Sequence, residues 1–180
     1  MADIHETTAI MDVQAGNADS YRIVVERYHR GLIQHLYNLT RDVALAEDIA
    51  QDAFVRAYEK IAQYNPEYAF STWLYKIADN LAYNHLRRAR PTMALEEHEE
   101  RIADDRPSLE EFTDREITKR SVQAALETLP LAYRQVIALY YWDNFSYEEI
   151  AAIMDRPVGT VRTWLHRAKQ QLRKELYGQL

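Results

Sequence analysis

The sequence contains no cysteine, which excludes disulfide bonds, thiol catalysis and cysteine-ligated metal sites. Only four glycines and five prolines occur in 180 residues, and this scarcity favours helices over most of the chain. No apolar run approaches the roughly 18 residues that a membrane span needs. The polar N-terminus does not resemble a signal peptide. We therefore expect a mostly helical cytoplasmic protein without membrane insertion.

Catalytic and metal-binding patterns are also missing. The six histidines are scattered without the spacing of metal ligands, and there is no glycine-rich loop that could hold a phosphate. No nucleophile stands with a recognisable base. We therefore expect a protein that is not an enzyme and that uses no cofactor and no metal.

Charge is unevenly distributed along the chain, whose formal net charge is −6. Residues 91–116 hold three Lys or Arg against ten Asp or Glu and have almost no periodic apolar positions, a composition typical of a linker. Residues 117–180 instead hold nine Lys or Arg against six Asp or Glu. We therefore predict an all-α fold of two small helical domains, residues 1–90 and 117–180, joined by a flexible acidic linker, residues 91–116.

The most informative segment lies in the second domain and has the pattern of a helix-turn-helix. Ser146 and Glu149 have the spacing of a capping box, which predicts the start of a short helix. Pro157 cannot continue a helix interior, so the turn at residues 155–157 should end that helix and start the next. The next helix has a buried stripe at three- and four-residue spacing, formed by Val158, Val161, Leu165, Ala168, Leu172 and Leu176.

The opposite face of that helix should point outward and is basic. Residues 158–174 include five Lys or Arg and no acid. Such a face suits the major groove of DNA, although a charged helix face can also be merely solvated. The side chains expected on it are Arg162, Thr163, His166, Arg167, Gln170 and Arg173.

The first domain should contain three substantial helices. The first begins after Asp19 or Ser20 and buries Ile23, Val24, Tyr28, Leu32, Leu36 and Leu39. The second covers about residues 43–63, with Tyr58 in its buried stripe. Its exposed side should carry Asp48, Gln51, Asp52, Val55 and Glu59, either as a solvated face or as a docking face for a basic partner.

An aromatic loop precedes the third helix, which we expect Ser71 to cap. The rings of Tyr64, Tyr68, Phe70 and Trp73 either fill the core or stack on unpaired bases. The arginines at the end of the helix either hold phosphates or counter the helix dipole. The outward face of the third helix should present Trp73, Lys76, Asn80, Tyr83, Asn84, Arg87 and Arg88.

These motifs, taken in order, resemble a known family. Residues 48–58, 70–80, 129–139 and 146–162 are similar to segments of the bacterial extracytoplasmic-function (ECF) sigma factors, the two-domain branch of the housekeeping sigma family. The similarity extends from about Tyr21 to Leu176 and in the last domain is greatest to the envelope-stress sigma factors. The resemblance implies an alternative sigma factor, whose domains would be sigma region 2 at residues 1–90 and sigma region 4 at residues 117–180.

The resemblance also implies partners and a role for each surface. The partners would be promoter DNA, core RNA polymerase through the clamp of its largest subunit and the flap of its second-largest subunit, and an anti-sigma factor. The clamp would bind Asp48, Gln51, Asp52 and Glu59. The minus-ten element would contact Tyr64, Tyr68, Phe70, Trp73, Lys76, Asn80, Asn84, Arg87 and Arg88. The minus-thirty-five element would contact Val158, Gly159, Thr160, Arg162, Thr163, His166, Arg167 and Arg173.

The recognition helix of this chain departs from the family pattern at two positions. Trp164 and His166 stand where the envelope-stress relatives have an arginine and an aromatic residue, so the minus-thirty-five preference should differ at its edges. Trp164 also lies near the buried stripe, where its ring can pack instead of binding DNA. A stand-alone helix-turn-helix regulator is the alternative function, and it would act as a dimer on a palindromic site.

Overall fold

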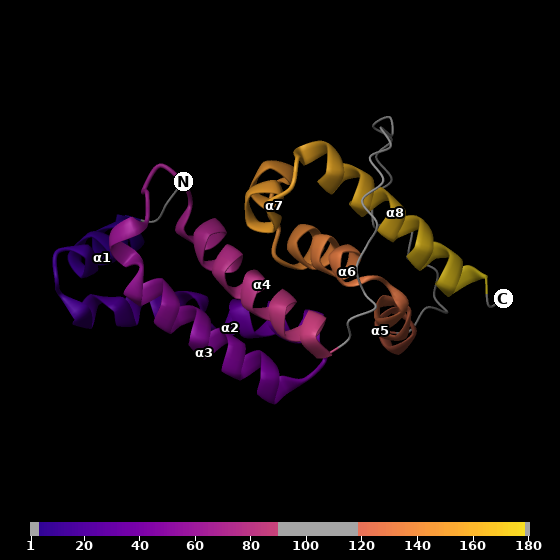
Figure 1. Ribbon diagram of the computed structural model, residues 1–180, viewed down its shortest axis with the longest axis horizontal. Helices are drawn as coiled ribbons and strands as arrows, with labels where there is room; N and C mark the ends of the chain where they lie inside the picture. The colour runs from indigo at the N-terminus through magenta and orange to yellow at the C-terminus, as the bar shows by residue number, and fades with distance from the viewer. Residues whose placement is uncertain (1–3, 90–118, 179–180) are drawn as a thin grey trace.

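The computed structural model describes residues 4–89 and 119–178, which form helices and turns without any strand (Figure 1). The first range contains α1 (Ile4–Gln14), η1 (Ala18–Ser20), α2 (Tyr21–Thr40), α3 (Val43–Glu59), η2 (Ile61–Gln63) and α4 (Phe70–Ala89). The second contains α5 (Lys119–Thr128), α6 (Leu131–Ile137), η4 (Ala138–Trp142), α7 (Tyr147–Met154) and α8 (Val158–Tyr177). The predicted linker at residues 91–116 lies outside the described residues.

Helices α2, α3 and α4 form the core of the first domain. Arg41 adopts a left-handed conformation that ends α2, and the Asp42 side chain then accepts a hydrogen bond from the Leu45 N–H to cap α3. The two helices are therefore antiparallel neighbours, and α4 packs against both. Their common core includes Leu32, Leu36, Ala46, Ala50, Phe54, Phe70 and Leu74.

Helix α1 is an element that the sequence analysis missed. It packs against α2, and the Gln14 amide donates hydrogen bonds to the carbonyls of Ile61 and Tyr64, at 2.8 and 3.3 Å. Two other expectations for this domain are wrong in detail. The helix predicted over residues 43–63 ends at Glu59 and is followed by the 3₁₀ turn η2, and α4 begins at Phe70, so Ser71 lies inside the helix.

The second domain contains the predicted helix-turn-helix, formed by α7 and α8. The capping box is confirmed: the Ser146 hydroxyl accepts from the Glu149 N–H, and the Glu149 carboxylate accepts from the Ser146 N–H. Asp155 ends α7 in a left-handed conformation, and Pro157 is the N-cap of α8. The predicted stripe of α8 is buried at Val161, Leu165, Ala168 and Leu172 and packs on α6 and α7.

The two domains pack directly against each other. Helix α4 lies along α7, and α2 contacts α6 and η4 (Figure 1). Helix α4 therefore has two buried sides, of which the sequence predicted only the one that faces α2 and α3. Within the described ranges, no helix is long and apolar enough to cross a membrane.

Candidate nucleic-acid interface

The N-terminal half of α8 presents the predicted basic face. Arg162 is exposed, and its guanidinium lies over the ring of Tyr147, 5.3 Å from the centroid. The Gln170 amide, one turn later, donates a 2.9 Å hydrogen bond to Nε2 of His166, and Arg167 is half-buried. Arg173 is exposed further along the helix. Val158, Gly159 and Thr160 form the first turn of α8, where the helix N-terminus favours an anion such as a DNA phosphate.

Thr163 is a correction to the predicted face. The side chain is buried, with only 8% of the residue exposed, and its hydroxyl donates to the Gly159 carbonyl one turn earlier at 2.9 Å. A threonine hydroxyl that bonds back to its own helix is not presented to a base. The neighbouring Trp164 is also buried, and the Arg156 guanidinium lies 6.0 Å from its ring centroid, so this ring packs instead of binding DNA.

The aromatic loop divides into packed and exposed rings. Tyr64 and Phe70 are buried, and together with the half-buried Trp73 they form a cluster with centroids 5.2 to 5.5 Å apart. The expectation that Tyr64 and Phe70 offer flat faces to DNA bases is therefore wrong, because both rings are covered by the protein core. Tyr68 is 65% exposed and is the most exposed of the four rings, so it remains available as a stacking platform.

A cavity of about 390 Å³ lies beside this loop. Residues of the loop and of α1 line it together, because Gln14 ties α1 to the carbonyls at the start of the loop. Sequence analysis did not find this cavity, since it did not predict α1. Its lining includes Glu6, Gln14, Tyr28, Tyr64, Tyr68 and Phe70.

The outward face of α4 is exposed toward its C-terminal end. Asn80, Asn84, Arg87 and Arg88 are all exposed, as predicted. Trp73 and Lys76, nearer the start of the helix, are half-buried instead. The Lys76 ammonium lies 3.6 Å from the carboxylate of Asp155, which belongs to the turn of the helix-turn-helix. The second domain therefore packs against the first half of α4, the predicted minus-ten helix.

The exposed side of α3 carries its predicted polar residues. Asp48, Gln51, Asp52 and Glu59 are all exposed. Of these four, Gln51 lines a groove of about 720 Å³ between α2 and α3, whose apolar lining the sequence analysis missed. Two apolar positions predicted as buried are wrong, because Ile23 and Tyr58 are 42% and 41% exposed. The apolar and aromatic lining of the groove comprises Tyr21, Val25, Ile33, Phe54, Val55 and Tyr58.

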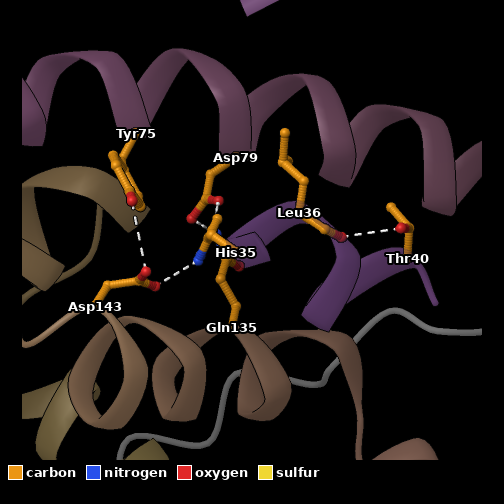
Figure 2. Close-up of polar contacts among 7 residues, drawn as sticks. All are labelled: His35, Leu36, Thr40, Tyr75, Asp79, Gln135 and Asp143. Carbon is orange, nitrogen blue, oxygen red and sulfur yellow. Dashed lines mark hydrogen bonds and ion pairs between the residues drawn. The ribbon is translucent and has the colours of Figure 1, made fainter. Parts of the chain in front are cut away.

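A buried polar cluster joins the two domains (Figure 2). His35 of α2 is completely buried, and its two ring nitrogens meet carboxylates of different domains: Nε2 lies 2.6 Å from Asp79 of α4, and Nδ1 lies 2.7 Å from Asp143. Gln135 of α6 donates to the second oxygen of Asp79 at 2.5 Å, and the Tyr75 hydroxyl donates to Asp143 at 3.5 Å. We call these five residues the interdomain cluster.

The two carboxylates control the protonation of His35. Burial by itself lowers the pKa of the imidazole, but the charge of Asp79 and the hydrogen bonds to Asp143 and Asp79 outweigh it and raise the pKa to about 10. His35 is therefore a charged imidazolium at neutral pH. Burial, followed by the nearby carboxylates, raises the pKa of Tyr75, which stays a neutral donor.

The interdomain cluster was invisible in the sequence. Its members are separated by up to 108 positions, and a lone histidine on a helix carries no signal of what lies opposite. Across residues 4–89 and 119–178, no group of three or more possible ligands is arranged to hold a metal ion.

Comparison with known proteins associates each domain with a described family. Residues 24–92 match the model "Sigma-70 region 2", and residues 119–172 match "Sigma-70, region 4". The chain is 36% identical to the ECF RNA polymerase sigma factor SigW of Bacillus subtilis, over 93% of this chain and 94% of that protein. It is 34% identical to the ECF RNA polymerase sigma-E factor of Escherichia coli, with 89% and 88% covered.

A solved structure shares the fold. It is the sigma factor RpoE of Bartonella quintana in complex with the anti-sigma factor NepR, with a TM-score of 0.68, 22% identity, and coverage of 88% of this chain and 98% of that one. At this identity the likeness concerns the fold alone. The match to region 2 in the first domain leaves no basis for the alternative of a stand-alone helix-turn-helix regulator.

Proposed function

The chain belongs to the extracytoplasmic-function sigma factors of the sigma-70 family, and from this premise we propose which of its surfaces meets the polymerase and which meets the promoter. It is an alternative sigma factor that binds core RNA polymerase and directs promoter-specific initiation of transcription. The observation that carries this function is the match of both domains, in order, to relatives that cover nearly the whole chain. We assign residues 1–90 to region 2 and residues 117–180 to region 4.

The docking surface for the clamp of the largest polymerase subunit is the exposed side of α3 with the adjacent groove. Asp48, Asp52 and Glu59 provide negative charge, and Gln51 provides an amide. The groove beside them provides apolar surface, including the half-exposed Val55 and Tyr58. Such a surface suits a basic helical partner: the charges steer the encounter, and the apolar groove supplies binding energy.

The minus-ten element is held by the C-terminal half of α4 and by the loop before it. Arg87 and Arg88 bind phosphates, which fixes the register of the strand. Asn80 reads the edge of a base that has left the stack, and Tyr68 supplies the exposed ring on which a base lies. Trp73 adds the exposed part of its ring to this surface, and Lys76 joins it when its pair with Asp155 of the second domain is broken.

The minus-thirty-five element is read by α8 in the major groove. Arg162 contacts a base edge, with His166 and Arg167 one turn further on, and the first turn of α8 receives a phosphate at its N-terminus. Arg173 lies nearly two turns beyond His166 and holds the DNA backbone. The same domain meets the flap of the second-largest polymerase subunit.

Other features of the proposal follow from membership in the family. An anti-sigma factor restrains the chain, as NepR binds the structurally similar RpoE. The protein acts in the cytoplasm, on the nucleoid when bound to polymerase, and catalyses no reaction of its own.

Run-off transcription tests the function directly. Core polymerase is mixed with the purified chain and a library of promoters with randomised minus-ten and minus-thirty-five elements, and the transcripts are sequenced. We expect transcripts that depend on the chain and that share one motif at each element. Transcription that is no greater than with core polymerase alone would refute the proposal.

A further inference from the structure

The buried Tyr64 is bonded to the backbone of Tyr68, the most exposed ring of the aromatic loop. Its hydroxyl donates to the Tyr68 carbonyl. Its own ring is fixed in the aromatic cluster, where its centroid lies 5.2 Å from that of Phe70 and 5.4 Å from that of Trp73. Burial raises the pKa of Tyr64 above its usual value, so the phenol stays a hydrogen-bond donor.

Helix α1 supports the start of the same loop. The Gln14 amide donates to the carbonyls of Ile61 and Tyr64, at 2.8 and 3.3 Å. The Tyr64 N–H also bonds to the Ile61 carbonyl, at 3.1 Å, so this turn is held from two sides. Helix α1 is in turn anchored to α2, because the buried Glu6 carboxylate accepts a 2.9 Å hydrogen bond from the Tyr28 hydroxyl.

Hydrogen bonds within the loop fix its course between Tyr64 and Tyr68. The Asn65 side chain accepts from the Glu67 N–H and donates to the Glu67 carboxylate, both at 3.0 Å, as asparagine does in turns. The Tyr68 N–H donates to the Asn65 carbonyl at 3.2 Å. Both backbone groups of Tyr68 are therefore bonded, while 65% of the residue is exposed. Tyr68 presents a free ring on a fixed backbone.

We propose that Tyr64 and Gln14 are positioning residues for base capture, which hold the backbone of Tyr68 in the conformation on which a base of the melted minus-ten strand stacks. This inference rests on the proposed role of Tyr68. A loop that is ordered before DNA arrives loses little backbone entropy on binding, so the stacked base is bound more tightly. Tyr64 and Gln14 thus contribute to promoter binding without touching the DNA.

The first test measures the affinity of the holoenzyme for a premelted minus-ten fork template. Tyr64→Phe removes only the hydroxyl and leaves the ring in the core, and Gln14→Met removes the amide donor at similar length. Each should lower the affinity by about three- to tenfold. Thr40→Val is the matched control and should bind normally, since it removes a hydroxyl that donates to a backbone carbonyl of α2, that of Leu36, at 2.9 Å. Wild-type affinity in Tyr64→Phe would overturn the proposal.

Combination with Tyr68→Ala separates positioning from general damage to the domain. In a chain that lacks the Tyr68 ring, Tyr64→Phe has nothing to position and should change fork affinity by less than about twofold. An equal loss with and without the Tyr68 ring would overturn the proposal. If the role of Tyr68 itself is wrong, Tyr68→Ala will bind the fork normally and the inference fails with it. If only the positioning is wrong, Tyr68→Ala will bind weakly and Tyr64→Phe normally.

The second test measures the order of the loop in the free chain, without DNA or polymerase. The Tyr68 N–H is bonded to the Asn65 carbonyl, so its hydrogen exchange reports how often the loop opens. In Tyr64→Phe and Gln14→Met this amide should exchange about three- to tenfold faster than in the wild type, whereas Thr40→Val should leave its rate unchanged. An unchanged rate in both loop variants would overturn the positioning role.

Discussion

Arg162 is the residue on which recognition of the minus-thirty-five element should depend most. Its guanidinium is exposed on the outward face of α8 and rests on the Tyr147 ring, which limits its freedom before DNA arrives. Arg162→Ala should cost about 1 to 3 kcal/mol of binding and flatten the preference at one or two base pairs. Affinities of the full chain for single-base variants of the element at two salt concentrations measure both effects.

Two substitutions serve as controls for that prediction. Arg173→Ala should weaken binding to all sequences alike and lower the salt slope by about one unit. Thr163→Val should leave base preference unchanged, because the side chain is buried and bonded to Gly159. Altered preference in Thr163→Val, or unaltered preference in Arg162→Ala, would contradict this view of α8.

Tyr68 can be tested against its buried neighbour. Tyr68→Ala removes an exposed ring and should weaken binding to a premelted fork template by about 1 to 3 kcal/mol without changing the unfolding midpoint. Phe70→Ala removes a ring from the core and should instead destabilise the domain by about 3 to 5 kcal/mol. Fork binding and denaturant unfolding, measured on both variants, show whether the two rings have these separate roles.

Among the helices, the boundaries that depend on local capping and helix-breaking residues were predicted best from the sequence. Ser146, Glu149 and Pro157 lie within one helix and turn, and their capping and helix-breaking properties do not need the rest of the chain. Helix α1 and the apolar groove were missed because both are defined by packing against distant residues. Of the candidate sites, the exposed polar residues of α3 and α4 were placed correctly, whereas Thr163, Tyr64 and Phe70 were not.

The capping box gives a prediction for α7. Ser146→Ala removes the acceptor of the Glu149 N–H and should lower the free energy of unfolding by about 1 kcal/mol. Ser71→Ala is the matched control, since Ser71 lies inside α4 and does not cap it, and its effect should stay within about 0.5 kcal/mol. Urea unfolding of the two variants measures the difference; equal losses would contradict the assignment of the cap.

The acidic side of α3 gives a second prediction at this scale. Asp48→Lys together with Asp52→Lys should abolish co-purification with core polymerase and leave helicity and melting unchanged, because both side chains are exposed. Glu26→Lys, an exposed charge reversal on α2, is the control and should retain binding. Undiminished binding by the double variant would remove the docking role from this face.

For the whole molecule, the interdomain cluster links stability to pH. A histidine whose pKa is about 10 in the folded protein and about 6.5 in the unfolded chain contributes stability that is complete below about pH 6.5 and is lost as the pH rises toward 10. The unfolding midpoint measured by calorimetry should therefore fall as the pH rises from 6.5 to 9. In His35→Gln the midpoint should fall less over the same pH range, and an equal fall in the two proteins would refute the coupling.

Because residues of both domains bury the interdomain cluster, a domain cannot be exchanged freely for that of another protein. Residues Gln135 and Asp143 of the second domain satisfy His35 and Asp79 of the first, so neither domain is a self-sufficient module at this contact. In a chimera that takes its second domain from another source, the two domains will pack in this way only if the new domain brings a carboxylate and an amide to the same two places. Substitutions at these four positions should therefore occur together, and mismatched chimeras should have the weaker contact between their domains.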